Sequence, residues 1–218
     1  MIDLSFSNAT DGPLKLMLLG AHPDDIEIGC GATVLKMLDQ YADLRIMWVV
    51  LSGNNSRKAE ARMSADIFRG NSTEGRVELV SFKDGYFPQE YGAIKDYFEQ
   101  KLKPFDPSII FTHYGGDKHQ DHRLVSDLTR QTFRNHLILE YEILKYDGDL
   151  GQPNVYFQVS KAYGNAKAKA LMDCFKSQTD KHWFTKDTFR SMLRIRGVEA
   201  ASSTGLAEAF YGKKMRIR

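Results

Sequence analysis

The sequence predicts an α/β protein of one domain, in which a mostly parallel β-sheet is covered by helices on both faces. Short apolar segments, typical of strands buried on both sides, alternate along the 218 residues with segments whose apolar residues recur at helical spacing. This alternation is the pattern of βαβ units, in which a helix crosses between two parallel strands. No internal repeat and no linker rich in proline, glycine or serine divides the chain, which predicts a single domain.

The first half of the chain shows the alternation most clearly. Residues 14–19 are almost all apolar and predict a buried strand, and apolar residues at helical spacing then continue to about Tyr41. Residues 57–68 are rich in good helix formers, and Gly70 ends that pattern. The other elements expected here are a strand at 44–51, a strand at 77–80, a turn at 84–88 and a helix at 93–102 before Pro104.

The second half continues with less regular segments. Residues 108–112 predict a strand, and a polar loop at 113–122 leads into a helix that runs to about Phe133. Residues 140–146 alternate polar and apolar side chains, which predicts a strand with one exposed face. The remaining expected elements are a strand at 155–159 and helices at 161–175 and 186–194, with the segment from Ala207 left unassigned. Together these elements predict a Rossmann-like sandwich of three layers.

Composition and charge exclude several classes of protein. Apolar residues make up 42% and charged residues 27% of the chain, as in ordinary globular proteins. A formal net charge of +2 gives no reason to expect a nucleic-acid or membrane partner, and no apolar run approaches the roughly 18 residues of a membrane span. Two cysteines without a Cys-x-x-Cys motif, and a first segment unlike a signal peptide, predict a protein of the reducing cytoplasm.

Two polar loops follow predicted strands, and together they carry four of the six histidines. The first reads His-Pro-Asp-Asp at 22–25, and the second spans 113–122 and contains His113, His119 and His122. Ligands of open parallel sheets bind at the carboxyl ends of the strands, and these ends all lie on one edge. The two loops are therefore expected to converge, although they are far apart in the sequence.

The residue types in these loops suit a metal ion. Crowding a histidine and several carboxylates at the end of a buried strand is costly unless they share a partner, and imidazole with carboxylate is a donor set typical of zinc. His22 and Asp25 are three residues apart, as are His119 and His122, so each pair can face one way within a helical turn. Catalytic zinc usually keeps three protein ligands, which leaves one of the four candidates to act as an acid or to stabilise an oxyanion.

Each loop alone has a simpler explanation. Asp24 and Asp25 can cap a helix and complement its dipole, and His119 and His122 can be solvated loop residues. It is the combination of the two loops that favours a metal site. His113, directly after a strand, is expected to support the fold or another histidine rather than to bind the ion. The remaining expectations place His136 and His182 on the surface or in the core and Cys30 as a packed thiol.

These residues resemble the motifs of a known family. The sequence Ala-His-Pro-Asp-Asp at 21–25 with Glu27, followed by His-Gln-Asp-His at 119–122, is similar to the paired motifs of the LmbE-like, or PIG-L, zinc-dependent N-deacetylases. Further matches are the R-x-x-E-A pattern at 57–61, the K-x-x-A-L pattern at 167–171 with Ser-Gln at 177–178, and the R-G and A-E-A-F patterns at 196–197 and 207–210. The resemblance covers about residues 14–211 and predicts one deacetylase domain spanning residues 1–218.

The resemblance implies a division of roles within the site. It implies His22, Asp25 and His122 as the zinc ligands, with Fe²⁺ or another divalent ion as an alternative to zinc. Asp24 matches the general base of the family, which takes a proton from a water molecule activated by the ion. His119 matches the histidine that stabilises the oxyanion in its protonated form or gives a proton to the leaving amine. The implied reaction removes the N-acetyl group of an N-acetylglucosamine-type sugar and releases acetate.

Three more residues take supporting roles by the same resemblance. Asp121 matches a carboxylate that orients a histidine, Glu27 is expected to support the turn, and Arg57 matches an arginine that contacts the substrate. The expected substrate is an N-acetylated sugar, a sugar nucleotide or a glycolipid precursor. Two alternatives stay open: a metal-dependent amidase or esterase for another acyl substrate, and a zinc- or sugar-binding module without catalysis. A homo-oligomer is open as well.

The sequence departs from the family pattern at two positions near the second motif. Gln120 replaces a proline, which removes a restraint on φ but no ligand. Asp117 stands where some members have a tyrosine, and Tyr114 is the substitute that the sequence offers for it. Tyr86, Tyr114 and Trp183 are candidates to stack on a sugar ring, whereas Trp48 is expected in the core.

Overall fold

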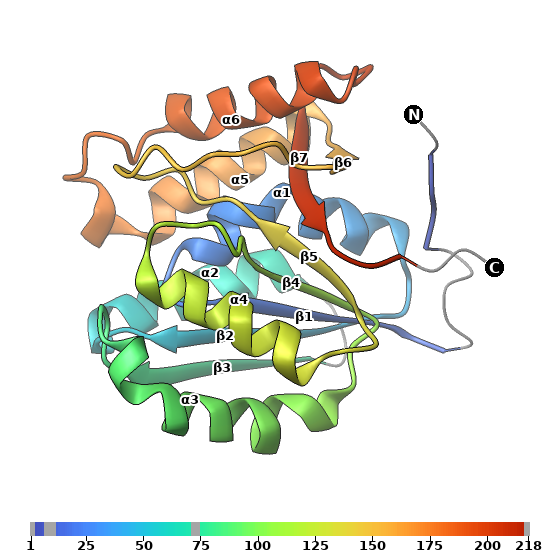
Figure 1. Ribbon diagram of the computed structural model, residues 1–218. Helices are drawn as coiled ribbons and strands as arrows, with labels where there is room; N and C mark the ends of the chain where they lie inside the picture. Colours follow the sequence, from blue (N-terminus) through green and yellow to red (C-terminus); the bar gives the residue numbers. More distant parts are fainter. Residues whose placement is uncertain (1–2, 7–11, 71–74, 216–218) are drawn as a thin grey trace.

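The computed structural model of the protein describes residues 3–6, 12–70 and 75–215, and one seven-stranded sheet forms its centre (Figure 1). The strands are β1 (Leu14–Gly20), β2 (Leu44–Ser52), β3 (Gly75–Phe82), β4 (Ile109–His113), β5 (Leu137–Tyr141), β6 (Val155–Gln158) and β7 (Ala207–Gly212). They lie in the order β3-β2-β1-β4-β5-β7-β6. β7 runs antiparallel to both of its neighbours, and the other neighbouring pairs are parallel. The predicted α/β fold with a mostly parallel sheet is confirmed.

Helices cover both faces of this sheet. They are α1 (Asp25–Gln40), α2 (Asn55–Arg69), α3 (Tyr91–Tyr97), α4 (Gln120–Thr132), α5 (Lys161–Cys174) and α6 (Lys186–Glu199). α1, α2 and α5 pack on one face and α3 and α4 on the other, while α6 packs against β7 and α5 (Figure 1). After α3 the chain turns through a π-helical segment at Phe98–Leu102, so the helix predicted at 93–102 is not one α-helix. Within the described ranges, no helix is long and apolar enough to cross a membrane.

Side chains of β1 contribute to two separate cores because they alternate across the sheet. Leu16 and Leu18 pack with α1 and α2, whereas Met17 and Leu19 pack with the helices on the opposite face. All four side chains are fully buried. This is the burial expected of a central strand in a parallel sheet covered on both sides, and it explains why the segment is almost continuously apolar.

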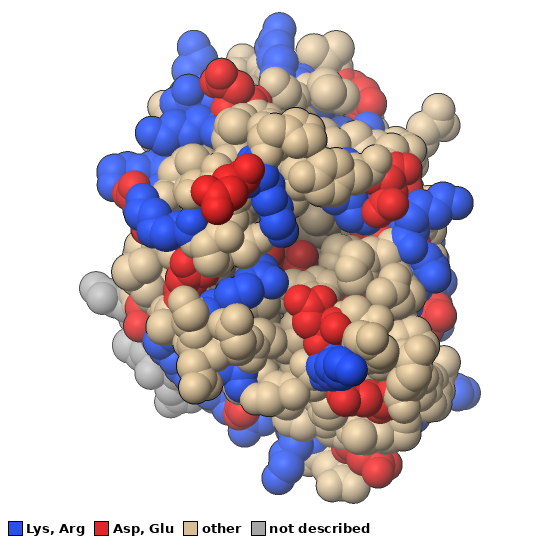
Figure 2. All heavy atoms as spheres, turned by 90° about the vertical axis from the view of Figure 1, so that its left-hand side faces the viewer, with Lys and Arg blue, Asp and Glu red and all other residues tan. Residues whose placement is uncertain are grey.

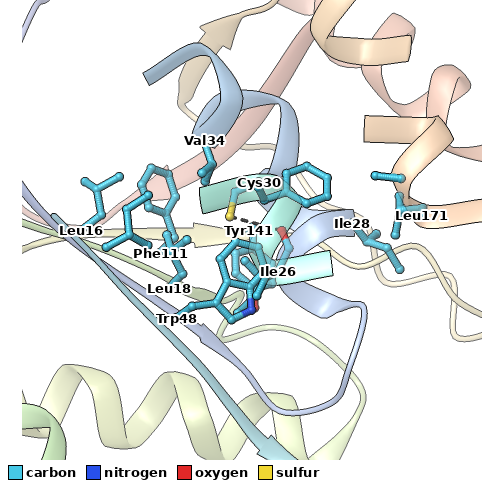
Figure 3. Close-up of a cluster of buried hydrophobic side chains, with 14 of the residues drawn as sticks. Leu16, Leu18, Ile26, Ile28, Cys30, Val34, Trp48, Phe111, Tyr141 and Leu171 are labelled. Atoms are coloured by element: carbon cyan, nitrogen blue, oxygen red, sulfur yellow. Dashed lines mark hydrogen bonds between the residues drawn. The ribbon is translucent and has the colours of Figure 1, made fainter. Parts of the chain in front are cut away.

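Figure 3 shows the core between the sheet and α1. Trp48 is fully buried in it, which confirms its predicted place. The Cys30 thiol is also buried and donates a hydrogen bond to the Ile26 carbonyl at 3.3 Å, so it is a packed thiol, as predicted. Gly29 allows α1 to approach the sheet closely, because a Cβ at that position would lie 2.2 Å from Cδ2 of Tyr141. The start of α1 is thus fixed against the carboxyl end of β5.

The prediction of a half-exposed strand at 140–146 is wrong. β5 ends one residue before Glu142, and both Glu140 and Glu142 are buried. Cationic partners explain the discrepancy, because Arg130 Nε lies 3.3 Å from Glu140 Oε1 and Arg196 Nη2 lies 2.6 Å from Glu142 Oε2. Alternating polar residues usually mark a solvent-facing side of a strand, but these two are buried as members of ion pairs.

The segment left unassigned from Ala207 onward forms β7, between β5 and β6. Its Glu208 accepts hydrogen bonds from the backbone N–H groups of Ala32 and Thr33 in α1, at 3.1 and 2.6 Å, and from Lys167 Nζ in α5 at 2.6 Å. This strand therefore joins two helices to the sheet. The domain limits of 1–218, with a core at about 14–211, stay a prediction.

Candidate metal and active site

Three candidate ligand atoms converge where β1 and β4 end. His22 and Asp25 follow β1, and His122 lies in the first turn of α4. His22 Nδ1 is 3.1 Å from His122 Nε2 and 3.4 Å from Asp25 Oδ2, and the last two atoms are 3.6 Å apart. Ligand atoms held tetrahedrally at 2.0–2.1 Å from zinc lie about 3.3–3.4 Å from one another, so this triangle fits the ion. The structure thus brings together the three ligands that the resemblance implies.

Protonation in this triangle also bears on metal binding. Burial lowers the pKa of His122 to about 4, which keeps its ring neutral at neutral pH. Burial acts in the same direction on His22, but hydrogen bonds to Asp121 and Asp25 outweigh it and raise the pKa of His22 well above its usual value. Metal ligands must be deprotonated. An ion held at this triangle would therefore displace a proton from His22.

The backbone at Asp24 separates the two neighbouring carboxylates. Asp24 has a φ of 94°, in the left-handed region that residues with side chains rarely adopt, and α1 begins at the next residue. Asp25 turns back, so that its Oδ2 accepts the His22 N–H at 2.7 Å. Asp24 makes no side-chain capping hydrogen bond, which removes the alternative of a simple helix cap for this residue. Strained backbone of this kind is concentrated at functional sites.

The Asp24 carboxyl lies beside the ligand triangle without being part of it. Burial and the neighbouring Asp25 charge raise its pKa to about 7, against the opposing charges of Arg57 and Lys181. Arg57 Nη2 lies 3.4 Å from Asp24 Oδ1 and donates a hydrogen bond to the Pro23 carbonyl at 2.7 Å. A carboxyl with a pKa near neutrality is suited both to accept a proton and to return it.

Carboxylates orient both histidines of the triangle. His22 Nε2 lies 3.2 Å from Asp121 Oδ2 and 3.1 Å from Asp84 Oδ1. His122 Nδ1 lies 2.9 Å from Asp117 Oδ2. Such contacts fix the ring and its tautomer and leave the other nitrogen free for the ion. The contact between Asp121 and His22 agrees with the role that the resemblance implies for Asp121.

Asp84 and Asp117 are the partners that the sequence analysis missed. Asp84 reaches the site because Asp121 accepts the backbone N–H groups of Gly85 and Phe87, at 2.7 and 3.1 Å, and so holds the turn after β3 against α4. No sequence pattern indicates that contact. The sequence marks Asp117 only as a replaced tyrosine, although a carboxylate five residues before a ligand histidine is itself a signal of an orienting partner.

Other donor sets overlap with this triangle. His113 could join Asp25 and His122, but its Nε2 already accepts the N–H of Ala21 at 3.0 Å, and it is fully buried. This contact agrees with the supporting role expected for His113. Two further sets share His22, one with His119 and His122 and one with Asp84 and Asp121. The carboxylates of that last set are the ones that orient the ring.

His119 faces the same cluster, and its ring is held by the backbone that follows it. Its Nδ1 accepts the N–H of Asp121 at 3.2 Å, so a neutral ring carries its proton on Nε2. Burial and the positive charge of His22 lower the pKa of His119. In its neutral form His119 donates from Nε2, and the protonated form expected from the sequence stays a prediction.

The cluster lines an open cavity of about 220 Å³. The other walls come from Arg57 of α2, from residues 145–147 after β5 and from Lys181 and Trp183 before α6. Figure 2 looks at this edge of the sheet and shows a hollow bordered by basic and acidic side chains. The cavity therefore combines the candidate metal ligands with charged and aromatic groups from distant parts of the chain.

The aromatic side chains at the cavity differ in part from those expected. Trp183 lines it, as the sequence allowed, together with Tyr146, and their ring centroids are 6.4 Å apart. Tyr146 is 69% exposed and had no signal in the sequence. Tyr114, the proposed substitute for the missing tyrosine, instead stacks on Tyr211 with centroids 3.9 Å apart. It is not among the described residues that line the cavity.

Glu27 is buried in α1, and neither of its carboxyl oxygens has a hydrogen-bond partner among the residues that the structure describes. Burial raises its pKa to about 8, so the carboxyl is neutral at pH 7. Glu27 therefore makes no hydrogen bond to the described residues of the loop that would hold the turn. Its predicted support of the turn stays a prediction.

A family comparison bears on what this cluster does. The sequence profile described as PIG-L, GlcNAc-PI de-N-acetylase, matches residues 17–133, which is more than half of the chain and includes both loops of the site. The chain belongs to the PIG-L family. Membership makes it a hydrolytic N-deacetylase of a metal-dependent family.

Individual relatives of the PIG-L chain extend this comparison. The uncharacterized deacetylase YaiS of Escherichia coli K12 is 29% identical over 186 residues, which cover 77% of this chain and 92% of YaiS. The N,N'-diacetylchitobiose deacetylase from Pyrococcus horikoshii has a TM-score of 0.65 at 16% identity and covers 96% of this chain and 87% of its own. GalB, the 4-carboxy-2-hydroxymuconate hydratase from Pseudomonas putida KT2440, has a TM-score of 0.71 at 15% identity, with 94% and 98% covered. These two structures share the fold of the PIG-L chain and differ in reaction.

Proposed function

We propose that the protein is a zinc-dependent deacetylase that hydrolyses the N-acetyl group of an N-acetylglucosamine-type sugar and releases acetate. One observation carries the proposal: three donor atoms lie within 3.6 Å of one another beside Asp24, a buried carboxyl outside their triangle, at an open cavity. His22, Asp25 and His122 would hold the ion, with Fe²⁺ as the alternative metal. A mere metal store would not need Asp24 in a strained backbone.

Water activation depends on Asp24. When bound, zinc supplies Lewis-acid chemistry, in that it lowers the pKa of a water molecule toward about 7 and polarises a carbonyl. Asp24 in its ionised form takes the proton of the attacking water as the new bond to the acetyl carbon forms. Arg57, 3.4 Å away, favours that ionised form. The proton is then held on a carboxyl with a pKa close enough to neutrality to give it up again.

Cleavage of the amide depends on two further proton positions. The neutral His119 donates a hydrogen bond from Nε2 to the oxygen on which negative charge develops, which is worth of order 3 kcal/mol for a well-placed donor. The carbon–nitrogen bond then breaks, and Asp24 returns its proton to the leaving nitrogen. The products are acetate and the free amine of the sugar, and Asp24 is again ionised for the next cycle.

The walls of the cavity support a sugar substrate. Trp183 and the exposed Tyr146 offer aromatic faces that suit the apolar face of a sugar ring. Arg57 and Lys181 place two cations at the same cavity, and Lys181 has no carboxylate within ion-pair distance among the described residues. These cations favour an acetylated sugar that carries a phosphate or another acidic group. The Pyrococcus horikoshii enzyme, which shares the fold, is a deacetylase of an acetylated amino sugar.

A substrate screen tests the proposal. The zinc-loaded protein is incubated with N-acetylglucosamine, its 1- and 6-phosphates, a nucleotide-linked form and N,N'-diacetylchitobiose, and both acetate and new amine are measured. We expect equal amounts of the two products, with higher kcat/KM for the acidic sugars. O-acetyl and bulky N-acyl sugars serve as controls. If only these controls are turned over, the esterase or amidase alternative replaces the proposal. If the sugars bind and none is turned over, the non-catalytic alternative replaces it.

The cytoplasmic location stays a prediction from the sequence, and a homo-oligomer stays open.

A further inference from the structure

We propose that Lys145 and Asp117 form a positioning pair that fixes His122 in the tautomer able to bind the metal. The inference rests on the proposed function, because it takes His122 as a ligand. It concerns two residues that the family resemblance does not assign, one of which stands where some members have a tyrosine. The pair acts through His122; because Lys145 also lines the cavity, the test measures metal binding in the absence of substrate.

The first step is the contact between Asp117 and His122. Asp117 is 2% exposed, and its Oδ2 lies 2.9 Å from His122 Nδ1. An ionised carboxylate only accepts hydrogen bonds, so Nδ1 must carry the proton of the neutral ring. The lone pair is then on Nε2, the nitrogen that lies 3.1 Å from His22 Nδ1 and 3.6 Å from Asp25 Oδ2. The opposite tautomer would turn an N–H toward the ion.

The second step is the partner that holds the Asp117 carboxylate in place. A buried carboxylate is costly unless it is paired and hydrogen-bonded. Lys145 Nζ lies 3.0 Å from Asp117 Oδ1, and the N–H of His119 donates to the same oxygen at 2.7 Å. The Lys145 side chain is only 10% exposed and also pairs with Asp149 at 2.5 Å. The two oxygens of Asp117 thus face different partners, and its carboxylate has little freedom to rotate.

The third step is the loop that carries Lys145. Glu142, at the start of this loop, accepts hydrogen bonds from Arg196 of α6 at 2.6 Å and from Tyr211 of β7 at 2.8 Å. It also accepts the N–H of Gly151, at 2.8 Å, which closes the loop on itself. The ammonium of Lys145 is therefore presented to Asp117 from a segment fixed at both ends. Arg196 of the R-G pattern at 196–197 therefore has a structural role, because it holds Glu142.

Zinc affinity without substrate is the measurement that tests the pair. We compare the wild type with Asp117→Asn, Lys145→Met and Lys145→Arg, by competition with a chromophoric chelator. Loss of an orienting carboxylate typically weakens metal binding by about 10–100-fold, and we expect this for Asp117→Asn. Lys145→Met should weaken it several-fold and Lys145→Arg less. The double variant should be no weaker than Asp117→Asn alone, because the two residues act as a unit.

Lys118→Met is the matched control, because it removes the same charge from the exposed neighbour of Asp117 and should leave zinc affinity unchanged. The visible spectrum of the Co²⁺ form should change in Asp117→Asn and not in Lys118→Met. If Asp117→Asn does not fold, Lys145→Met decides, since it keeps the bond between Asp117 and His122. A wild type without zinc affinity overturns the proposed function itself. If the wild type binds zinc and the variants of the pair bind it equally well, this inference is overturned and the proposed function stands. The same holds if Lys145→Met changes KM and leaves zinc affinity unchanged.

Discussion

Asp24 shows how a single residue can be set apart from its neighbours by its backbone. Its left-handed φ lies between the extended strand end and the helical Asp25, so two adjacent carboxylates face different groups. Asparagine tolerates the left-handed region at least as well as aspartate. Asp24→Asn therefore removes the proton acceptor with little change to the backbone, and it separates the loss of chemistry from the loss of structure.

We expect Asp24→Asn to lower kcat by about 10²–10⁴-fold, the range typical of a general base, while zinc remains bound. The zinc content of the purified variant and its kcat on the best substrate of the screen are the two measurements. Asp66→Asn, on the exposed side of α2, is a control with the same chemical change and should keep wild-type kcat. Unchanged kcat in Asp24→Asn would remove this residue from the role of base.

The buried Glu27 carboxyl should affect the stability of the fold and not catalysis. Its pKa rises from 4.5 to about 8 on folding, so between these values the folded chain keeps a proton that the unfolded chain has lost. The free energy of unfolding contributed by this group is therefore full below about pH 4.5 and falls as the pH rises toward about 8. Glu27→Gln keeps the shape of the side chain and removes the titration.

Urea unfolding of the metal-free protein at pH 5 and pH 8 measures this effect. The drop in stability between the two values should be smaller in Glu27→Gln than in the wild type, by about 2–4 kcal/mol. At pH 8 the variant should be at least as stable as the wild type. Equal drops in the two proteins would show that Glu27 is ionised or hydrated in the folded state.

At the scale of elements, burial limited what the sequence could predict. β1, α1, β2 and β4 follow from apolar periodicity, because each of them buries apolar side chains in one of two cores. β5 does not follow in the same way. Glu140 in β5 and Glu142 just after it are buried beside arginines that come from α4 and α6. A periodicity argument assigns polar residues to solvent, and only the tertiary structure supplies the buried cation.

The packing of α1 on β5 can be tested with two glycines. A methyl group at Gly29 would overlap the Tyr141 ring, whereas nothing lies within 4 Å of the position that a Cβ would take at Gly92 in α3. Gly29→Ala should lower the free energy of unfolding by about 1–3 kcal/mol or more, because the Tyr141 ring is fully buried and cannot move away freely. Gly92→Ala should raise it by a few tenths of a kcal/mol, because alanine favours the helix.

Urea denaturation of both variants at one pH provides the comparison, with the wild type as reference. Gly29→Ala should also weaken zinc binding, since Tyr141 donates to the Leu19 carbonyl at the base of the first loop. Equal stabilities for the two variants would mean that α1 can move away from the sheet at no cost.

At the scale of the whole molecule, the topology of the sheet made the place of the site predictable. The long-range contacts that complete the site could not be predicted. Parallel strands end on one edge, so the convergence of the loops after β1 and β4 follows from the fold class. The positions of Asp84, Lys145 and Trp183 depend on how three other connections fold over that edge. These contacts join residues far apart in the chain, and no local pattern in the sequence encodes them.

Zinc should stabilise the whole chain, because the triangle joins two loops that separate on unfolding. At a free zinc concentration of 100 times Kd, the expected stabilisation is about 2.7 kcal/mol. For a chain of this length that corresponds to a rise in Tm of about 5–10 °C. Differential scanning calorimetry with a chelator and with zinc gives the shift. His122→Ala should show no shift, whereas His136→Ala, far from the site, should shift like the wild type.

The place of β7 in the sheet has a consequence for synthesis. Among the described strands β6 pairs with β7 alone, which follows it after α5 and α6, so a growing chain cannot dock β6 until β7 has been made. During that interval Lys167 lacks Glu208, and α6 lacks the strand against which it packs. Such exposed surfaces promote aggregation and chaperone binding. We therefore expect the sheet to be completed only after β7 has been translated, when both loops of the site have long been made.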